Sequence, residues 1–181
     1  MFDTDKIMYE IAAACVKAGP EQCTLHDSTA EGVIVHMESI LDGLKKRPIA
    51  VPDSAAPFGN PYGMIDYKLV KEALLMATYG PYGDGPIGAR HLLAIFSALE
   101  EGDGSPLWSF VTTFLERLSC QCPTPGTPLP PDIVTPDATQ AIACNDAQRQ
   151  RDTVEDLERY MTRTARVSKF ADVWPIRAVC S

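Results

Sequence analysis

The chain has 181 residues, of which 45% are apolar and 22% are charged, and this composition predicts one globular domain with a buried core. Its 24 acidic side chains outnumber the 16 basic ones, and no basic run is longer than residues 45–47, so a nucleic-acid partner is not expected. No apolar stretch is long enough to span a bilayer, and the first ten residues lack the basic and apolar regions of a signal peptide. We therefore expect a soluble chain without a membrane span, in a compartment that the sequence leaves open.

The first two predicted helices are marked by capping residues and by apolar side chains at helical spacing. Asp3 and Thr4 can cap the first helix, which ends at Gly19 and Pro20. Residues 28–31 form a capping-box pattern for the second helix, in which the Ser28 hydroxyl is the expected cap, and Pro48 ends it. The expected apolar faces are Ile7, Met8, Ile11, Ala12 and Cys15 in the first helix and Val33, Met37, Ile40, Leu41 and Leu44 in the second.

The middle of the chain predicts a small hairpin followed by three more helices. Residues 49–66 contain two short strand-like segments on either side of a turn-rich stretch. Apolar residues then return to helical spacing over residues 67–79, 88–101 and 106–118. The expected fold is therefore mainly α, a helical bundle with a small irregular or hairpin segment.

A proline-rich connector separates this helical body from the last part of the chain. Residues 119–137 contain six prolines, which fix φ and remove hydrogen-bond donors, so an extended surface segment is expected there. Asp152 is the expected cap of a long final helix, and residues 169–174 are expected to start another. The predicted organisation is a body over residues 1–118, the connector, and a return segment over residues 138–181 that packs on the body as one domain.

Two local patterns resemble known sites but lack the context that those sites need. Residues 83–88 match GxGxxG, but the segment before them is predicted as helix and no βαβ unit surrounds them. Cys120 and Cys122 do not have the C-x2-C spacing of a zinc site. The sequence also contains no GxSxG elbow, HExxH motif or Walker loop. We expect no nucleotide cofactor and no metal, and the chain alone shows no complete catalytic constellation.

His91 and four tyrosines are the candidates for a small-molecule site. Tyrosine combines apolar area with a polar tip, so Tyr62, Tyr67, Tyr79 and Tyr82 could line such a site, and packing in the core explains them equally well. A lone histidine on a helix, such as His91, is more often a surface or packed residue than a general base.

An ordered set of motifs over nearly the whole chain resembles the helical lid region of tripeptidyl-aminopeptidase-like α/β-hydrolases. The most specific member is the C-x-x-A-G-P-x-x-C pattern over residues 15–23. The others are Arg47-Pro48, the Tyr62-Gly63-x-x-Asp66-Tyr67 step, the turn at residues 79–81, the helix end at residues 99–103, the A-I-x-C-x-D motif at residues 141–146, and the closing residues 170–180.

This resemblance implies a lid without its catalytic core. In the family the nucleophilic serine precedes this region, and the triad aspartate and histidine follow it, so the closing segment ADVWPIRAVCS would lead into the core strand that carries the acid. The resemblance also implies disulfides between Cys15 and Cys23 and between Cys144 and Cys180, and the family is largely secreted. After residues 79–81 the family tends to have a turn containing tryptophan, whereas this chain has YGDGPIG.

Two functions of different classes follow. In the first, which the N-terminal Met and the coherent helical unit favour, a stand-alone lid homologue binds a small hydrophobic molecule and acts as an isomerase or cyclase of secondary metabolism. Tyr67, Tyr82 and Trp108 would then contact the substrate, with His91 and Tyr79 as catalytic hydrogen-bond donors. In the alternative, the chain is a substrate-gating lid fragment or subunit of a serine hydrolase, and an exposed apolar face would favour it. A homodimer would cover the same face.

Overall fold

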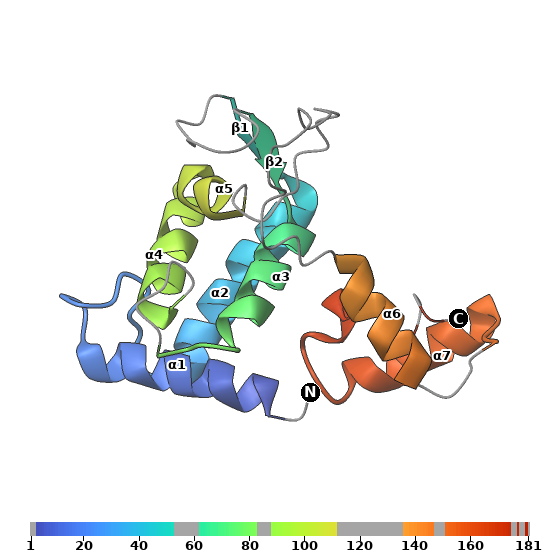
Figure 1. The fold of residues 1–181 in the computed structure, drawn as a ribbon. Coiled ribbons are helices and arrows are strands. Elements are labelled where there is room, and N and C mark those ends of the chain that lie inside the picture. Colours follow the sequence, from blue (N-terminus) through green and yellow to red (C-terminus); the bar gives the residue numbers. More distant parts are fainter. Residues whose placement is uncertain are drawn as a thin grey trace, which may run out of the picture. The chain divides into compact units, whose positions relative to one another are not determined.

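The computed structural model describes residues 3–52, 62–82, 88–111, 136–146 and 151–174, together with Arg177 and Cys180. The chain divides into two units, Met1–Glu116 and Arg117–Ser181. Over the described residues the secondary structure consists of α-helices, one two-stranded sheet and one short 3-10 turn (Figure 1). The mainly α fold predicted from the sequence is confirmed.

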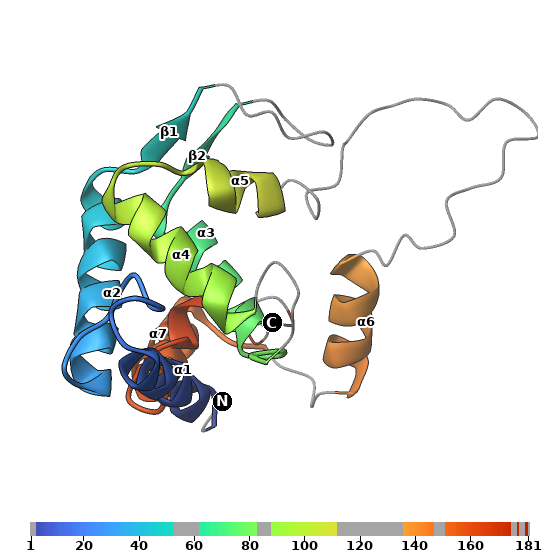
Figure 2. The ribbon, with the colours of Figure 1, turned by 90° about the vertical axis from the view of Figure 1, so that its left-hand side faces the viewer.

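Over its described residues, the first unit contains five helices. They are α1 (Thr4–Ala18), α2 (Ala30–Lys46), α3 (Tyr67–Ala77), α4 (Ala89–Glu100) and α5 (Ser105–Val111). Helix α2 contacts α1, α3 and α4, and α3 also contacts α4. Figures 1 and 2 show α1 across one end of this group and the hairpin with α5 at the opposite end. The expected helix over residues 106–118 is described only as far as Val111, and residues 112–118 lie outside the described ranges.

The core of the first unit is formed by the helix faces that the apolar spacing predicts. Of the ten residues expected to form the faces of the first two helices, all but Ile7 and Ile40 are buried, and those two are half-buried. Phe96 and Leu92 of α4, Val70 and Leu74 of α3, and Leu107 of α5 complete this core. The apolar area that these side chains remove from water is the main stabilising contribution.

The predicted hairpin consists of β1 (Ile49–Val51) and β2 (Gly63–Ile65), which pair antiparallel with Ala50 opposite Met64. Val51 and Ile65 are buried, and β2 contacts α5. Gly63 lies directly against the indole of Trp108, so closely that any Cβ there would overlap the ring. The hairpin is therefore fixed to α5 at a position that only glycine fits.

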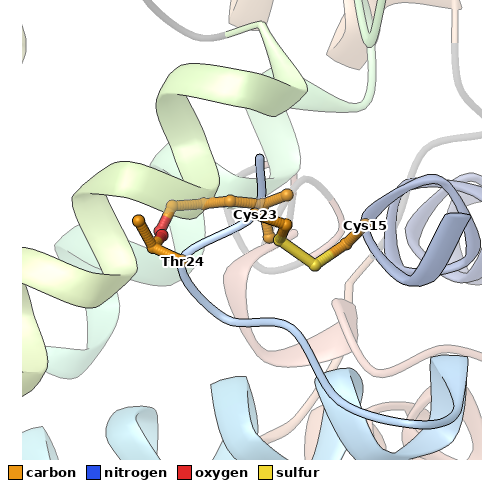
Figure 3. Close-up of a disulfide and its surroundings, with 4 residues drawn as sticks. Cys15, Cys23 and Thr24 are labelled. Atoms are coloured by element: carbon orange, nitrogen blue, oxygen red, sulfur yellow. A yellow bond between two sulfur atoms is a disulfide. The ribbon is translucent and has the colours of Figure 1, made fainter. Parts of the chain in front are cut away.

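A disulfide fixes the loop after α1. Cys15 and Cys23 are bonded with their Cα atoms 5.4 Å apart, and both are buried. Next to it, Thr24 Oγ1 donates a hydrogen bond to the backbone oxygen of Leu93 in α4 at 3.3 Å (Figure 3). Helix α1 ends before this loop at Gly19, whose φ of 80° suits glycine.

The caps of the first two helices differ from those that the sequence predicts. Asp3 holds the N-cap position of α1, but its carboxylate accepts a hydrogen bond from Lys6 Nζ at 2.9 Å and caps no backbone N–H. In α2 the cap is Thr29, which has the extended backbone of an N-cap residue and whose Oγ1 accepts from Gly32 N at 3.0 Å, while Ser28 donates to Asp27. The prediction of Ser28 as the cap was wrong by one residue.

The second unit contains α6 (Pro136–Asp146), α7 (Val154–Ala165) and the 3-10 turn η1 (Ala171–Val173), which contacts α7. Thr153, and not the predicted Asp152, caps α7 in a capping box with Asp156. Residues 169–174, which were expected to start another helix, contain the η1 turn, and Arg177 beyond them is helical. Sequence reasoning missed α6, because its first residues belong to the proline-rich stretch.

A second disulfide joins α6 to the end of the chain. Cys144 and Cys180 are bonded with their Cα atoms 5.1 Å apart. The two cysteine pairs are those that the resemblance implies. The boundary between the units follows Glu116, close to the predicted end of the body, and the packing of the return segment on the body stays a prediction.

Candidate functional site

Three of the expected site residues lie where α3 ends and α4 begins. Tyr79 and Tyr82 are 68% and 89% exposed, and His91 in the first turn of α4 is also exposed. Met76, in the last turn of α3, adds an apolar side chain that is 52% exposed. We call Met76, Tyr79 and Tyr82 the α3 patch.

Tyr67 lies at the other end of α3 and is engaged by lysines. Lys45 Nζ lies 4.3 Å and Lys71 Nζ lies 5.0 Å from the centre of its ring, and Lys71 also donates a hydrogen bond to its hydroxyl. Such contacts are attractive because the ring face carries negative charge density. Lys45 in turn donates to Asp42 Oδ1 at 2.9 Å, which raises the pKa of Lys45. The half-buried Tyr67 thus joins α2 and α3 through a cationic cluster.

Trp108 is a core residue of the first unit. Its side chain on α5 is only 7% exposed and covers Gly63 of the hairpin. The buried position explains the residue as a packing element.

The structure does not bring the five expected site residues together. Tyr67 lies at the start of α3, whereas Tyr79, Tyr82 and His91 follow its end. The helix has 11 residues, so it is about 16 Å long at 1.5 Å per residue. Trp108 belongs to the hairpin end of the unit, which is opposite the end formed by α1 (Figures 1 and 2). Each group is locally plausible as a contact surface, but one small molecule does not reach both.

A different feature, which sequence reasoning missed, lies in the second unit. A polar hollow of about 610 Å³ opens beside α7. Its lining contains four guanidinium groups, two carboxylates and a hydroxyl, from Arg159, Arg163, Arg166, Arg177, Asp156, Glu158 and Thr162. The spacing of four and three residues between the arginines of α7 was the available signal, because it places them on one helix face.

One arginine of the hollow comes from the end of the chain. Arg177 donates from Nε to Asp152 Oδ2 at 2.6 Å and from a terminal nitrogen to Asp152 Oδ1 at 2.8 Å, and its guanidinium lies 4.8 Å from the centre of the Tyr160 ring. These hydrogen bonds raise the pKa of Arg177. Across the hollow, the pKa of Asp156 is lowered, mainly by hydrogen bonds from Thr153 and also by Arg159.

Several sequence patterns remain without a structural test. Residues 83–87 of the glycine-rich segment lie outside the described ranges, as do Cys120 and Cys122. Within the described ranges, no three His, Cys, Asp or Glu side chains stand close enough to hold a metal ion. None of the described helices combines the length and the hydropathy that crossing a membrane requires.

Comparisons with known proteins identify no relative of this chain. The chain has no significant match to any protein-family model, to any curated protein or to any solved structure.

Proposed function

We propose that the first unit, Met1–Glu116, is a helical lid that covers the catalytic site of a serine-hydrolase core and gates access of an apolar substrate. The core's nucleophile, acid and base would come from residues outside these 181, whether in the same chain or in another. The resemblance to the lid region of tripeptidyl-aminopeptidase-like hydrolases suggests this role. The observation that carries it is the exposed α3 patch.

The α3 patch has the size of an interaction surface. At about 200 Å² for a whole aromatic side chain, the exposed parts of Tyr79 and Tyr82 amount to roughly 300 Å², before Met76 is counted. Contiguous apolar patches of a few hundred Å² are about the largest on ordinary monomers and are often functional. A lid needs such a surface, because it closes over an apolar site.

Its chemistry also fits a gate better than a catalyst. Tyrosine offers a flat apolar face and a polar tip at a low entropy cost, and methionine adapts to irregular partners. His91, exposed on the next helix, can add a hydrogen bond at the edge. A general base would need an orienting partner and exclusion of water, and the exposed position of His91 provides neither by itself.

The stand-alone isomerase or cyclase has less support. It needs His91, Tyr79, Tyr67, Tyr82 and Trp108 around one substrate. The length of α3 separates Tyr67 from Tyr79, Tyr82 and His91, and the Trp108 ring packs against Gly63 of the hairpin. Shape-based catalysis of this kind depends on holding all the groups within a fraction of an ångström.

The decisive experiment isolates the protein from its source with an antibody against this chain and treats it with a fluorophosphonate probe, which labels activated serines. The labelled species is then identified by mass. We expect the labelled serine in a polypeptide that contains these residues or that copurifies with them in stoichiometric amount. A monomer or homo-oligomer of this chain alone, with no labelled serine, would overturn the proposal.

Variants of the isolated enzyme then test the patch itself. Tyr79→Ser with Tyr82→Ser is expected to raise KM for an apolar ester about tenfold and to change kcat little, because lid contacts contribute to binding. The matched control is Tyr9→Ser with Val35→Ser, which removes two apolar side chains that are 43% and 63% exposed elsewhere in the unit. An equal effect of both pairs would contradict a specific role of the α3 patch.

A further inference from the structure

Basic side chains are distributed unevenly between the two units. From residue 117 to the end the chain has eight basic and eight acidic side chains, so the first 116 residues carry the whole formal charge of −8. Seven of the eight basic residues in the second unit are arginines. Arginine differs from lysine in presenting a planar fork of donors that matches carboxylate and phosphate oxygens.

Three of these arginines form a stripe along α7, two within the helix and Arg166 at its C-cap. Arg159, Arg163 and Arg166 follow one another at intervals of four and three residues, so their Cα atoms fall within a narrow arc of the helix surface and span about 10 Å along its axis. Thr162 lies beside them and adds a hydroxyl to the same hollow. The stripe therefore faces one space.

A fourth arginine is held at this space by contacts that fix its orientation. Arg177 is anchored by two hydrogen bonds to Asp152, whose side chain is almost buried, and by the ring of Tyr160. A guanidinium fixed in this way loses little further entropy when it binds a ligand. The anchoring also holds the end of the chain next to α7.

The lining keeps a net charge of only +1 after its ion pairs are counted, because Arg163 and Arg166 remain against the carboxylate of Glu158 once Arg159 is paired with Asp156 and Arg177 with Asp152. Arg159 pairs with Asp156 within α7. Arg163 and Arg166 are exposed, and within the part of the chain that the structure describes neither side chain forms an ion pair. Attraction of the helix C-terminus for cations accounts for basic residues in the last turn, but not for a hollow that Arg177 completes from a different segment.

From this arrangement we infer that the hollow beside α7 is a binding site for a small organic oxyanion, a molecule bearing a phosphate or carboxylate group. Its volume of about 610 Å³ lies within the range of small-molecule sites. Arg163 and Arg166 supply the charge-assisted hydrogen bonds, Thr162 offers a neutral one, and Arg177 adds a guanidinium that its pair with Asp152 holds in place. The inference is independent of the proposed lid function, because it concerns only residues of the second unit.

The test follows the arginine Nε–Hε signals of the ¹⁵N-labelled full chain during separate titrations with inorganic phosphate, with succinate and with sodium chloride at matched ionic strengths. We expect saturable shifts with phosphate or succinate and none with chloride. Whichever of phosphate and succinate binds more tightly identifies the chemical class of the ligand, and equal affinities indicate a site for oxyanions in general. Shifts that do not saturate, or that chloride reproduces, would overturn the inference.

A charge-matched pair of variants locates the site. Arg163→Gln with Arg166→Gln should weaken oxyanion binding at least about tenfold, since two charge-assisted hydrogen bonds are lost. Lys17→Gln with Arg47→Gln removes the same charge from exposed positions in the first unit and should leave the affinity unchanged. Circular dichroism verifies that both variants fold. Equal affinity in the two variants would refute the assignment.

Discussion

Replacing Gly63 with alanine tests the close contact that fixes the hairpin to the helices. The added Cβ would lie 2.6 Å from Cε2 of Trp108 and closer still to two further ring atoms, well inside van der Waals contact. Trp108 is 7% exposed and held by α5, so the ring cannot move without disturbing its neighbours.

Two opposing effects set the magnitude. Overpacking of this kind costs typically about 1–3 kcal/mol. Loss of glycine's freedom in the unfolded chain returns about 0.4–1 kcal/mol. Gly63→Ala should therefore reduce the free energy of unfolding by about 1–2 kcal/mol, with the loss concentrated where the hairpin meets α5.

The measurement is urea unfolding followed by tryptophan emission. Trp174→Phe removes the only other tryptophan, so the signal reports Trp108 alone. Gly43→Ala is the control, because a Cβ at Gly43 in α2 meets nothing within 4 Å, and it should stabilise by about 0.5–1 kcal/mol. If Gly63→Ala were as stable as Gly43→Ala, the contact between the hairpin and Trp108 would not exist as described.

Three further predictions concern the caps of α2 and α7 and the disulfide of the second unit. Thr29→Ala should cost about 1 kcal/mol in thermal or urea unfolding, since it removes the cap of α2. The pKa of Asp156 is lower in the folded chain than its ordinary value of 3.8, so its capping contribution is complete above 3.8 and is lost as the pH falls through the lower native pKa. Helicity measured at 222 nm should therefore fall below about pH 4 in the wild type. It should fall less in Asp156→Asn, whose side chain does not titrate. Cys144→Ser should cost roughly 3–4 kcal/mol, because the bond closes a loop of 36 residues, and hydrogen exchange should show loss of protection in α6 before α7.

Most of the helical body could be predicted because its helices are amphipathic. The spacing of Met37, Leu41 and Leu44 identifies the buried face of α2 without any tertiary information, and all three are buried. Caps were less predictable, because Ser28 and Thr29 are both good caps and the choice depends on the Asp27 carboxylate, which accepts from Ser28 and from the Thr29 amide. Helix α6 was missed because Pro136 indicates a connector, although proline is also well suited to the first turn of a helix.

The candidate site was less predictable, because helical spacing places residues on a face but does not say which end of one helix meets which end of another. Tyr67 and Tyr79 belong to the same predicted helix and so appear as one cluster in the sequence. In the structure they face different surroundings, a pair of lysines for Tyr67 and the turn toward α4 for Tyr79. Trp108 is a similar case, because a tryptophan in the sequence fits a binding site and a buried core equally well.

The hollow beside α7 shows which part of a site the sequence can and cannot predict. The stripe of Arg159, Arg163 and Arg166 is local, and its spacing alone places three cations on one face. Arg177 lies 11 residues beyond Arg166, and nothing in the sequence indicates that Asp152 and Tyr160 hold it there. A solvated helix face needs only the local stripe, whereas a binding site needs a preorganised group from a second segment. Because Arg177 is that group, an affinity for phosphate or succinate that falls in Arg177→Gln as well as in the α7 double variant would distinguish a built site from a merely basic helix.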